Sequence, residues 1–239
     1  MKNDMLYRVK RAIILAAGEG KRMRPLTLET PKPLIPVNGI RMIDSIIAAL
    51  HENGIEEIHV VVGYKKEAFL PLAEEVSGLI LIENPWYDSC NNISSLYAAR
   101  EFLSDCLILD ADQWIRNSEI LSPAFDRSGY CAAWTDEGTE EWLLAVQGDG
   151  AVRSCSRTGG KSGWQLYSIS RWTEEDGRKL RGHLEQEFME KNNRQIYWDD
   201  VPLFCYPEEY ELGIYPIQKE DVLEIDSLEE LAAADPAYR

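Results

Sequence analysis

A short apolar run that ends directly in a basic glycine loop most constrains the fold of this chain. Residues Ala12–Ala17 are apolar throughout and continue into Gly18-Glu19-Gly20-Lys21-Arg22. A run of this length closed by glycines is typical of a buried parallel strand that is covered on both faces. We therefore expect a first strand followed by a loop whose backbone amides and cations can bind a polyphosphate.

The alternation of strands and helices continues beyond this loop. Strands are expected at 12–17, 58–62, 79–82 and 106–109, and helices at 43–50, 67–76 and 94–102. This order predicts an α/β fold with a doubly wound, mainly parallel, Rossmann-like sheet. Shorter strand candidates then indicate a smaller mixed or antiparallel region on the substrate side, at 130–134, 143–146, 152–155 and 165–169. A charged helix over 174–191, a strand over 222–225 and a helix over 228–234 complete the pattern.

The chain shows no boundary between separate domains. It has 239 residues and contains no Pro/Ser-rich linker, repeat or low-complexity segment. A length in this range is compatible with one large α/β domain. We expect a polar N-terminal tail over 1–10 and a single domain over 11–239, with a nucleotide-binding half at 11–112 and an acceptor half at 113–239.

Composition limits the possible partners. The sequence has 25 Lys and Arg against 41 Asp and Glu, which gives a formal net charge of −16 and disfavours nucleic acid or an anionic membrane as a partner. No apolar segment approaches the ~18 residues of a membrane span. The 5 cysteines include no C-x-x-C pair, which favours a reducing cytoplasm. No pattern specifies an oligomeric state.

The glycine loop fails the two commonest phosphate-binding motifs. A dinucleotide fingerprint would require glycine where Met23 stands. A P-loop would require glycine at Leu15 and a hydroxyl residue at Arg22. The loop therefore belongs to a different class of phosphate-binding site.

The loop and the segment Thr30-Pro31-Lys32-Pro33-Leu34 resemble the signature of the nucleotidyltransferases that activate sugar phosphates and phosphocholine. That signature reads Leu-x-Ala-Gly-x-Gly-x-Arg-Leu/Met-x-Pro-Leu-Ser/Thr, followed by Pro-Lys-Pro/Ala-Leu. Further segments resemble the bacterial CTP:phosphocholine cytidylyltransferases of this family in order and spacing, namely 91–97, 110–112, 141–142, 197–199 and 224–227. The resemblance covers Arg11 to about Leu231 and departs at Gln113 and over Cys205–Gly213.

The resemblance implies a nucleotide site and a metal site. Asp112 and Asp226 both follow expected strands, and two carboxylates together with phosphate oxygens suit Mg²⁺. Taken alone, each aspartate would fit a turn or a helix cap. The family pattern instead makes both of them Mg²⁺ ligands and assigns catalysis to Arg22, Lys32, Asp112 and Asp226. The nucleotide-binding candidates are Leu15, Ala16, Ala17, Gly18, Gly20, Arg22, Asn92, Ser95 and Asp110.

Aromatic residues paired with acids indicate the acceptor site. A quaternary ammonium donates no conventional hydrogen bond and is recognised by aromatic faces and carboxylates. Two segments offer such pairs, and the acceptor-binding candidates are Glu141, Trp142, Tyr197, Trp198 and Asp199. As core aromatics and solvated acids, the same residues would have no binding role.

These features predict a Mg²⁺-dependent cytidylyltransferase that converts CTP and phosphocholine to CDP-choline and pyrophosphate. An alternative acceptor is 2-aminoethylphosphonate, whose primary ammonium needs acidic acceptors more than aromatic faces. A sugar 1-phosphate fits the acceptor residues less well, because a neutral sugar gives no reason for paired acids and rings. A catalytically silent nucleotide sensor is the alternative outside the enzyme class.

Overall fold

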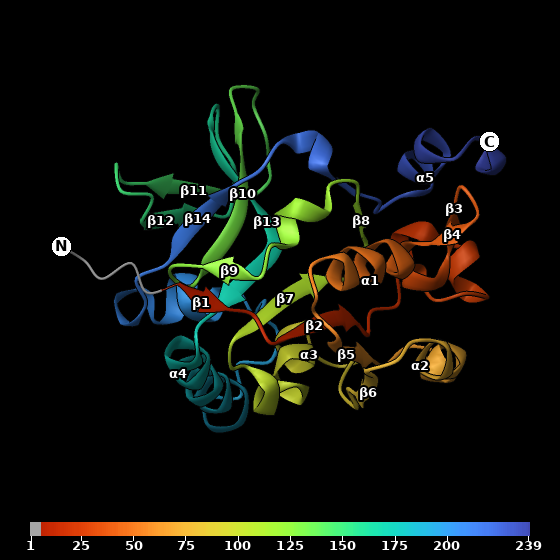
Figure 1. Cartoon of the computed structure of the whole chain (residues 1–239), viewed down its shortest axis with the longest axis horizontal. Helices are drawn as coiled ribbons and strands as arrows, with labels where there is room; N and C mark the ends of the chain where they lie inside the picture. Colours follow the sequence, from red (N-terminus) through yellow and green to blue (C-terminus); the bar gives the residue numbers. More distant parts are fainter. Residues whose placement is uncertain (1–5) are drawn as a thin grey trace.

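A computed structural model describes residues 6–239, which are built around a nine-stranded sheet (Figure 1). Four parallel strands form its N-terminal part, in the order β7 (Cys106–Asp110), β2 (Arg11–Ala16), β5 (Glu57–Val62) and β6 (Leu79–Glu83). β2, β5 and β7 are buried along nearly their whole length. Their continuous apolar sequences are therefore those of strands covered on both faces.

The rest of the sheet is mixed. β13 (Gly163–Trp172) lies antiparallel to β7 and joins the two parts. β11 (Leu143–Val146) and β12 (Val152–Ser156) continue the sheet to its edge. β10 (Gly129–Thr135) is antiparallel to β13 and parallel to β14 (Gly213–Pro216). The expected doubly wound, mainly parallel sheet with a smaller mixed region is confirmed.

Helices cover both faces of the sheet. α1 (Met42–Glu52) and α2 (Leu70–Glu75) contribute to the hydrophobic core on one face. α3 (Ile93–Ala98) and α4 (Glu174–Glu185) contribute to the core on the other. The helices expected over 67–76 and 94–102 are each a short α-helix with an adjoining 3₁₀ turn, at Lys66–Phe69 and Arg100–Phe102. α4 continues into a π-helical turn at Gln186–Glu190, within the helix expected over 174–191.

A small ladder returns the C-terminal part of the chain to the carboxyl edge of the parallel strands. β8 (Gln113–Ile115) pairs antiparallel with β15 (Val222–Glu224), and the Ile225 amide donates to the Asp112 carbonyl over 3.2 Å. α5 (Leu228–Ala234) follows, with Ser227 and Glu230 forming a capping box. Met23 from the glycine loop packs in a third core with Ile225. The loop and the C-terminal segment are therefore held against each other.

The remaining short strands lie outside the main sheet. β3 (Pro36–Val37) pairs with β4 (Ile40–Arg41), and β1 (Tyr7–Arg8) pairs with β9 (Ala124–Phe125). β1 falls inside the segment expected as a polar tail, because Tyr7 can pack its ring against Phe125 with 5.5 Å between centroids. Residues 1–5 of that tail lie outside the described residues. The single domain with halves at 11–112 and 113–239 stays a prediction.

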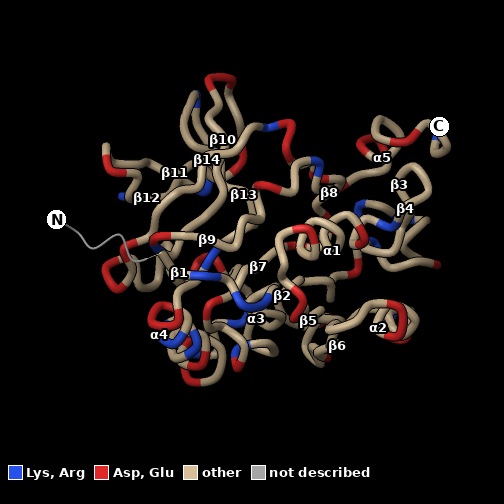
Figure 2. The backbone as a smooth tube through the Cα atoms, viewed as in Figure 1, with Lys and Arg blue, Asp and Glu red and all other residues tan. Residues whose placement is uncertain are grey.

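Charged residues are distributed over the whole chain (Figure 2). Lys and Arg alternate with Asp and Glu along α4, whereas Lys and Arg form a blue group near β3 and β4. No helix among residues 6–239 is long and apolar enough to cross a membrane.

The first turn of α4 packs so closely on the chain after α3 that only glycine fits at position 177. A β-carbon at Gly177 would lie 1.4 Å from the Leu103 carbonyl oxygen, whereas one at Gly182 in the same helix would meet nothing within 4 Å. Gly177→Ala should therefore lower the free energy of unfolding by at least about 2 kcal/mol. Gly182→Ala, the matched control, should raise it by about 0.5–1 kcal/mol. Urea denaturation measures both, and equal stabilities would contradict this packing.

Candidate active site

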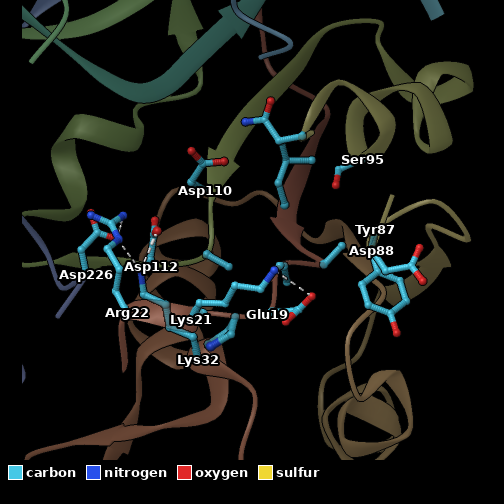
Figure 3. A pocket seen from close by; sticks show the side chains of 18 of the residues that line it. Glu19, Lys21, Arg22, Lys32, Tyr87, Asp88, Ser95, Asp110, Asp112 and Asp226 are labelled. Atoms are coloured by element: carbon cyan, nitrogen blue, oxygen red, sulfur yellow. Dashed lines mark hydrogen bonds and ion pairs between the residues drawn. The ribbon is translucent and has the colours of Figure 1, made fainter. Parts of the chain in front are cut away.

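One cavity lies at the carboxyl ends of β2 and β7, where open parallel sheets bind ligands (Figure 3). Its volume is about 470 Å³. The structure brings together all the catalytic and nucleotide-binding candidates in its lining: Leu15, Ala16, Ala17, Gly18, Gly20, Arg22, Lys32, Asn92, Ser95, Asp110, Asp112 and Asp226. Their roles toward a ligand stay predictions.

The glycine loop is held in shape by backbone conformation and by Thr27. Gly20 has a positive φ of 60°, and a β-carbon there would lie 3.0 Å from both Lys32 and Thr27 side-chain atoms. The Thr27 hydroxyl donates to the Gly20 carbonyl over 3.0 Å. A larger residue at position 20 would therefore be strained and crowded at once. This geometry explains why the loop sequence requires glycine beside a basic residue.

Lys32 joins two carboxylates that are far apart in the sequence. Its Nζ lies 2.8 Å from Asp112 Oδ2 and 2.6 Å from Asp226 Oδ1. Arg22 adds a second cation, with Nη2 at 3.0 Å from Asp226 Oδ1. Figure 3 shows these four side chains gathered on one side of the cavity, opposite Tyr87, Asp88 and Ser95. The predicted catalytic group is therefore one connected network of charges.

The network favours the charged forms of Lys32 and Asp226. Burial acts to lower the pKa of Lys32, but Asp112 and Asp226 outweigh it and raise that pKa above its ordinary value. Burial acts to raise the pKa of Asp226, but Lys32 and Arg22 hold it below its ordinary value. The Arg22 side chain remains 72% exposed, so it can reach an incoming anion.

The two aspartates fit a shared divalent cation. Oxygens of both carboxylates approach the single Lys32 ammonium, so one cation can bridge them. Among residues 6–239, no group of three or more His, Cys, Asp or Glu side chains could hold a metal. A cation at Asp112 and Asp226 would therefore take its other ligands from phosphate oxygens and water, as hard cations do in phosphoryl-transfer sites.

Asn92 and Ser95 reach the cavity from the start of α3. The Asn92 side-chain oxygen accepts from the Trp198 amide over 2.9 Å. The Ser95 hydroxyl accepts from the Asn84 side chain over 3.1 Å. Asn92 therefore also connects the nucleotide side of the cavity to the segment that carries the acceptor-binding candidates.

Two acids lie on the face of the sheet that α3 and α4 cover: Asp110, which lines the cavity, and Asp199, which does not. Burial first, and then the charges of Asp112 and Asp199, raise the pKa of Asp110 well above its ordinary value. Asp199 is only 6% exposed, and burial raises its pKa to about 7. The Tyr130 hydroxyl lies close enough to favour the charged form of Asp199. Oδ1 of Asp199 nevertheless receives no hydrogen bond of ordinary geometry from any residue of 6–239.

Glu224 adds a further acid beside the catalytic group. Burial, followed by the charge of Asp112, raises its pKa to about 7, and Gln113 donates to it over 3.2 Å. Glu141, an expected acceptor residue, contributes to this shift and therefore lies near Glu224. The site as a whole therefore has more buried acids than basic side chains paired with them.

The expected aromatic acceptor residues are only partly brought together. Trp142 and Tyr197 meet edge to face, with 5.8 Å between ring centroids. Trp198 is 1% exposed and packs between Tyr130 and Trp172, so it offers no free face to a ligand. The expectation for Trp198 is therefore corrected: as the largest apolar ring of its segment, it fills the core, and Tyr197 takes the exposed position.

Several residues at the site were missed by sequence analysis. Glu19, Lys21, Pro33, Tyr87, Asp88, Cys90 and Ala111 also line the cavity. Tyr87 and Asp88 follow β6, and their position after a parallel strand is a signal that could have indicated them. Phe204 and Arg157, which complete the aromatic group around Trp142, had no such signal because they come from segments remote in the sequence.

Comparison with known proteins identifies the class to which this fold and site belong. The MobA-like NTP transferase domain family matches residues 12–175. The chain belongs to this family and is a nucleotidyltransferase.

Relatives that match over nearly their whole length specify the kind of nucleotidyltransferase. A 2-aminoethylphosphonate cytidylyltransferase from Lancefieldella rimae is 38% identical over 229 residues, which cover 95% of this chain and 92% of the relative. A choline-phosphate cytidylyltransferase from Streptococcus pneumoniae is 32% identical and covers 92% of this chain and 94% of the relative. The solved CTP:phosphocholine cytidylyltransferase of Streptococcus pneumoniae superposes with a TM-score of 0.87 at 30% identity, over 97% of this chain and 100% of that one. The protein is thus of the cytidylyltransferase class.

The raised pKa of Asp199 predicts a pH-dependent stability. The folded state holds this proton more tightly than the unfolded chain does, so the stabilisation is fully present below about pH 4 and is lost as the pH rises through about 7. Asp199→Asn removes the titration. The variant should gain stability relative to the parent protein between about pH 4.5 and about pH 8, by up to about 4 kcal/mol.

Urea denaturation at the two pH values measures this gain. Asp136→Asn is the control, because Asp136 is exposed. If the free energy of unfolding changed with pH in the same way in Asp199→Asn and in the parent protein, the raised pKa of Asp199 would be contradicted.

Proposed function

We propose that this protein transfers the cytidylyl group of CTP to 2-aminoethylphosphonate, giving the cytidylylated phosphonate and pyrophosphate. The single observation that carries the choice of acceptor is the buried Asp199 carboxylate, whose charge acts on Asp110 and which, among residues 6–239, has the Tyr130 hydroxyl beside it but forms no ion pair. A primary ammonium has three N–H donors and can satisfy such oxygens, whereas a trimethylammonium has none. The 38% identical relative is named for the same phosphonate.

Electrostatics supports an ammonium at these acids. Burial raises the pKa of both Asp110 and Asp199, the charges of Asp112 and Asp199 raise that of Asp110 further, and among residues 6–239 neither acid forms an ion pair with a basic side chain. A bound ammonium would supply that missing charge and favour both carboxylates in their ionised form. The acids then act as binding residues for the amine, while the phosphonate end extends toward Lys32.

The residues of the glycine loop and the charge network would hold the nucleotide. Backbone amides of Gly18 and Gly20 face phosphate oxygens, and Arg22 neutralises their charge. Lys32 lies beside the α-phosphate, and Asn92 and Ser95 lie toward the cytosine and ribose. Mg²⁺, when held by Asp112 and Asp226, would withdraw charge from the phosphate oxygens of both reactants.

The chemical step requires positioning more than proton transfer. A phosphonate oxygen attacks the α-phosphorus of CTP, the bond from this phosphorus to the bridging oxygen of the β-phosphate breaks, and pyrophosphate leaves. The attacking oxygen is already anionic at neutral pH, so no general base is needed. Lys32 and Arg22 stabilise the charge that develops on the transferred group.

Phosphocholine is the second candidate, because the exposed ring of Tyr197 and the half-buried ring of Trp142 could receive a quaternary ammonium. The relative from Streptococcus pneumoniae is named for choline phosphate. Both acceptors use the same nucleotide site and the same network around Lys32.

Pyrophosphate release separates the candidates. With CTP and Mg²⁺, we expect 2-aminoethylphosphonate to give a kcat/KM at least about tenfold above that of phosphocholine, which corresponds to about 1.4 kcal/mol, and glucose 1-phosphate to be inactive. A preference for phosphocholine would overturn the choice of acceptor. Absence of release with every acceptor would contradict the proposed activity.

Asp112→Asn tests the proposed metal site. Loss of one carboxylate from the pair should lower kcat by at least about 10²-fold, because charge neutralisation at the phosphates supplies several kcal/mol. The Asp136→Asn control should keep its activity. Circular dichroism should show an intact fold in both variants. Undiminished Mg²⁺-dependent turnover by Asp112→Asn would show that Asp112 is not a metal ligand.

A further inference from the structure

The side chain of Arg157 already lies against the aromatic rings on the acceptor side of the site. Trp142 packs edge to face with Tyr197 at 5.8 Å and with Phe204 at 5.5 Å, and we call these three rings the aromatic cluster. The Arg157 guanidinium carbon lies 3.9 Å from the Phe204 ring centroid and 5.8 Å from that of Trp142. Both lie within the ~6 Å at which a cation is attracted to a ring face.

A buried carboxylate fixes Arg157 in this position. Arg157 forms an ion pair and a hydrogen bond with Asp200 Oδ1, and the Asp200 side chain is only 5% exposed. The other oxygen of Asp200 accepts from the Tyr197 amide over 2.9 Å. One aspartate therefore orients both the cation and one ring of the cluster. Removal of the guanidinium from Asp200 would leave a buried charge unpaired.

The aromatic cluster adjoins the catalytic cavity through the chain that links them. Tyr197 precedes Trp198, whose amide donates to Asn92 over 2.9 Å, and Asn92 lines the cavity. Asp199, the acid assigned above to the acceptor amine, follows in the same segment. Segment 197–200 thus carries both the exposed Tyr197 ring and the buried Asp199 carboxylate.

We propose that Arg157 determines the specificity of the acceptor site by occupying the aromatic cluster and excluding quaternary ammonium groups from it. The inference rests on the proposed function in placing the acceptor amine near Asp110 and Asp199. A trimethylammonium must displace the guanidinium from the rings and break its pair with Asp200 in order to bind there. A primary ammonium at the two acids leaves Arg157 in place.

The geometry explains why a resident arginine suits this role better than a lysine. A planar guanidinium can stack on a ring while it donates to a carboxylate at its edge. Arg157 meets both conditions at once, with Phe204 on its face and Asp200 at its Nη2. Arg157 then occupies the aromatic cluster, and an acceptor cation binds at Asp110 and Asp199 instead.

Substitution of Arg157 tests the inference through the ratio of kcat/KM for phosphocholine to kcat/KM for 2-aminoethylphosphonate. Arg157→Ala should raise kcat/KM for phosphocholine relative to 2-aminoethylphosphonate by at least about tenfold, or about 1.4 kcal/mol, while KM for CTP stays within about threefold. Arg157→Gln removes the charge but keeps a donor for Asp200, so it should shift the ratio in the same direction with a thermal midpoint closer to that of the parent protein. A general loss of structure would lower both activities and leave their ratio unchanged.

Arg153→Ala is the matched control, because Arg153 is an exposed arginine on β12, the strand that ends immediately before Arg157. Its acceptor ratio should equal that of the parent protein. An unchanged ratio in folded Arg157→Gln and Arg157→Ala would overturn the role of Arg157. A parent protein that already prefers phosphocholine would instead overturn the proposed acceptor, and the two failures are therefore distinguishable.

Discussion

The ion pairs that the Lys32 ammonium forms with two carboxylates are the interaction on which the rest of the site depends. The ammonium binds Asp112 and Asp226, which lie 80 and 194 residues further along the chain. Each of these carboxylates stands at the end of a different structural unit, one after β7 and the other after β15. The ion pairs of Lys32 therefore connect the end of the parallel sheet to the β8–β15 ladder, beside the apolar contact of Met23 with Ile225. Sheet, loop and C-terminal segment are thus joined by a few ionic contacts at one edge.

Uncompensated negative charge gives the site its chemical character. Asp110, Asp199 and Glu224 all have pKa values raised by burial and by neighbouring acids. Arg22 and Lys32 pair with Asp112 and Asp226, whereas these three acids form no ion pair with a basic side chain among residues 6–239. Such an arrangement favours a substrate that has an anion at one end and a cation at the other. A neutral sugar would leave the same acids unpaired.

Much of the fold could be predicted because the spacing of apolar residues in the sequence indicates which segments are buried. Continuous apolar runs identified β2, β5 and β7, and the glycine loop indicated the edge of the sheet at which the cavity lies. The aromatic residues were harder, since Trp142, Tyr197 and Trp198 have the same character in sequence and differ only in packing. Trp198 fills the core, while Tyr197 is exposed. Arg157 could not be predicted at all, because its contacts with Phe204 and Asp200 are tertiary and leave no local pattern.

The β8–β15 ladder couples ligand binding to the integrity of the whole chain. Asp226 reaches the cavity only while β15 remains paired with β8, so local unfolding of the C-terminal segment would remove half of the carboxylate pair. A ligand that needs both carboxylates binds the closed form alone and resists this opening by mass action. Occupied protein should therefore exchange the amide hydrogens of this ladder more slowly, which makes the backbone that adjoins the two carboxylates a reporter of ligand binding.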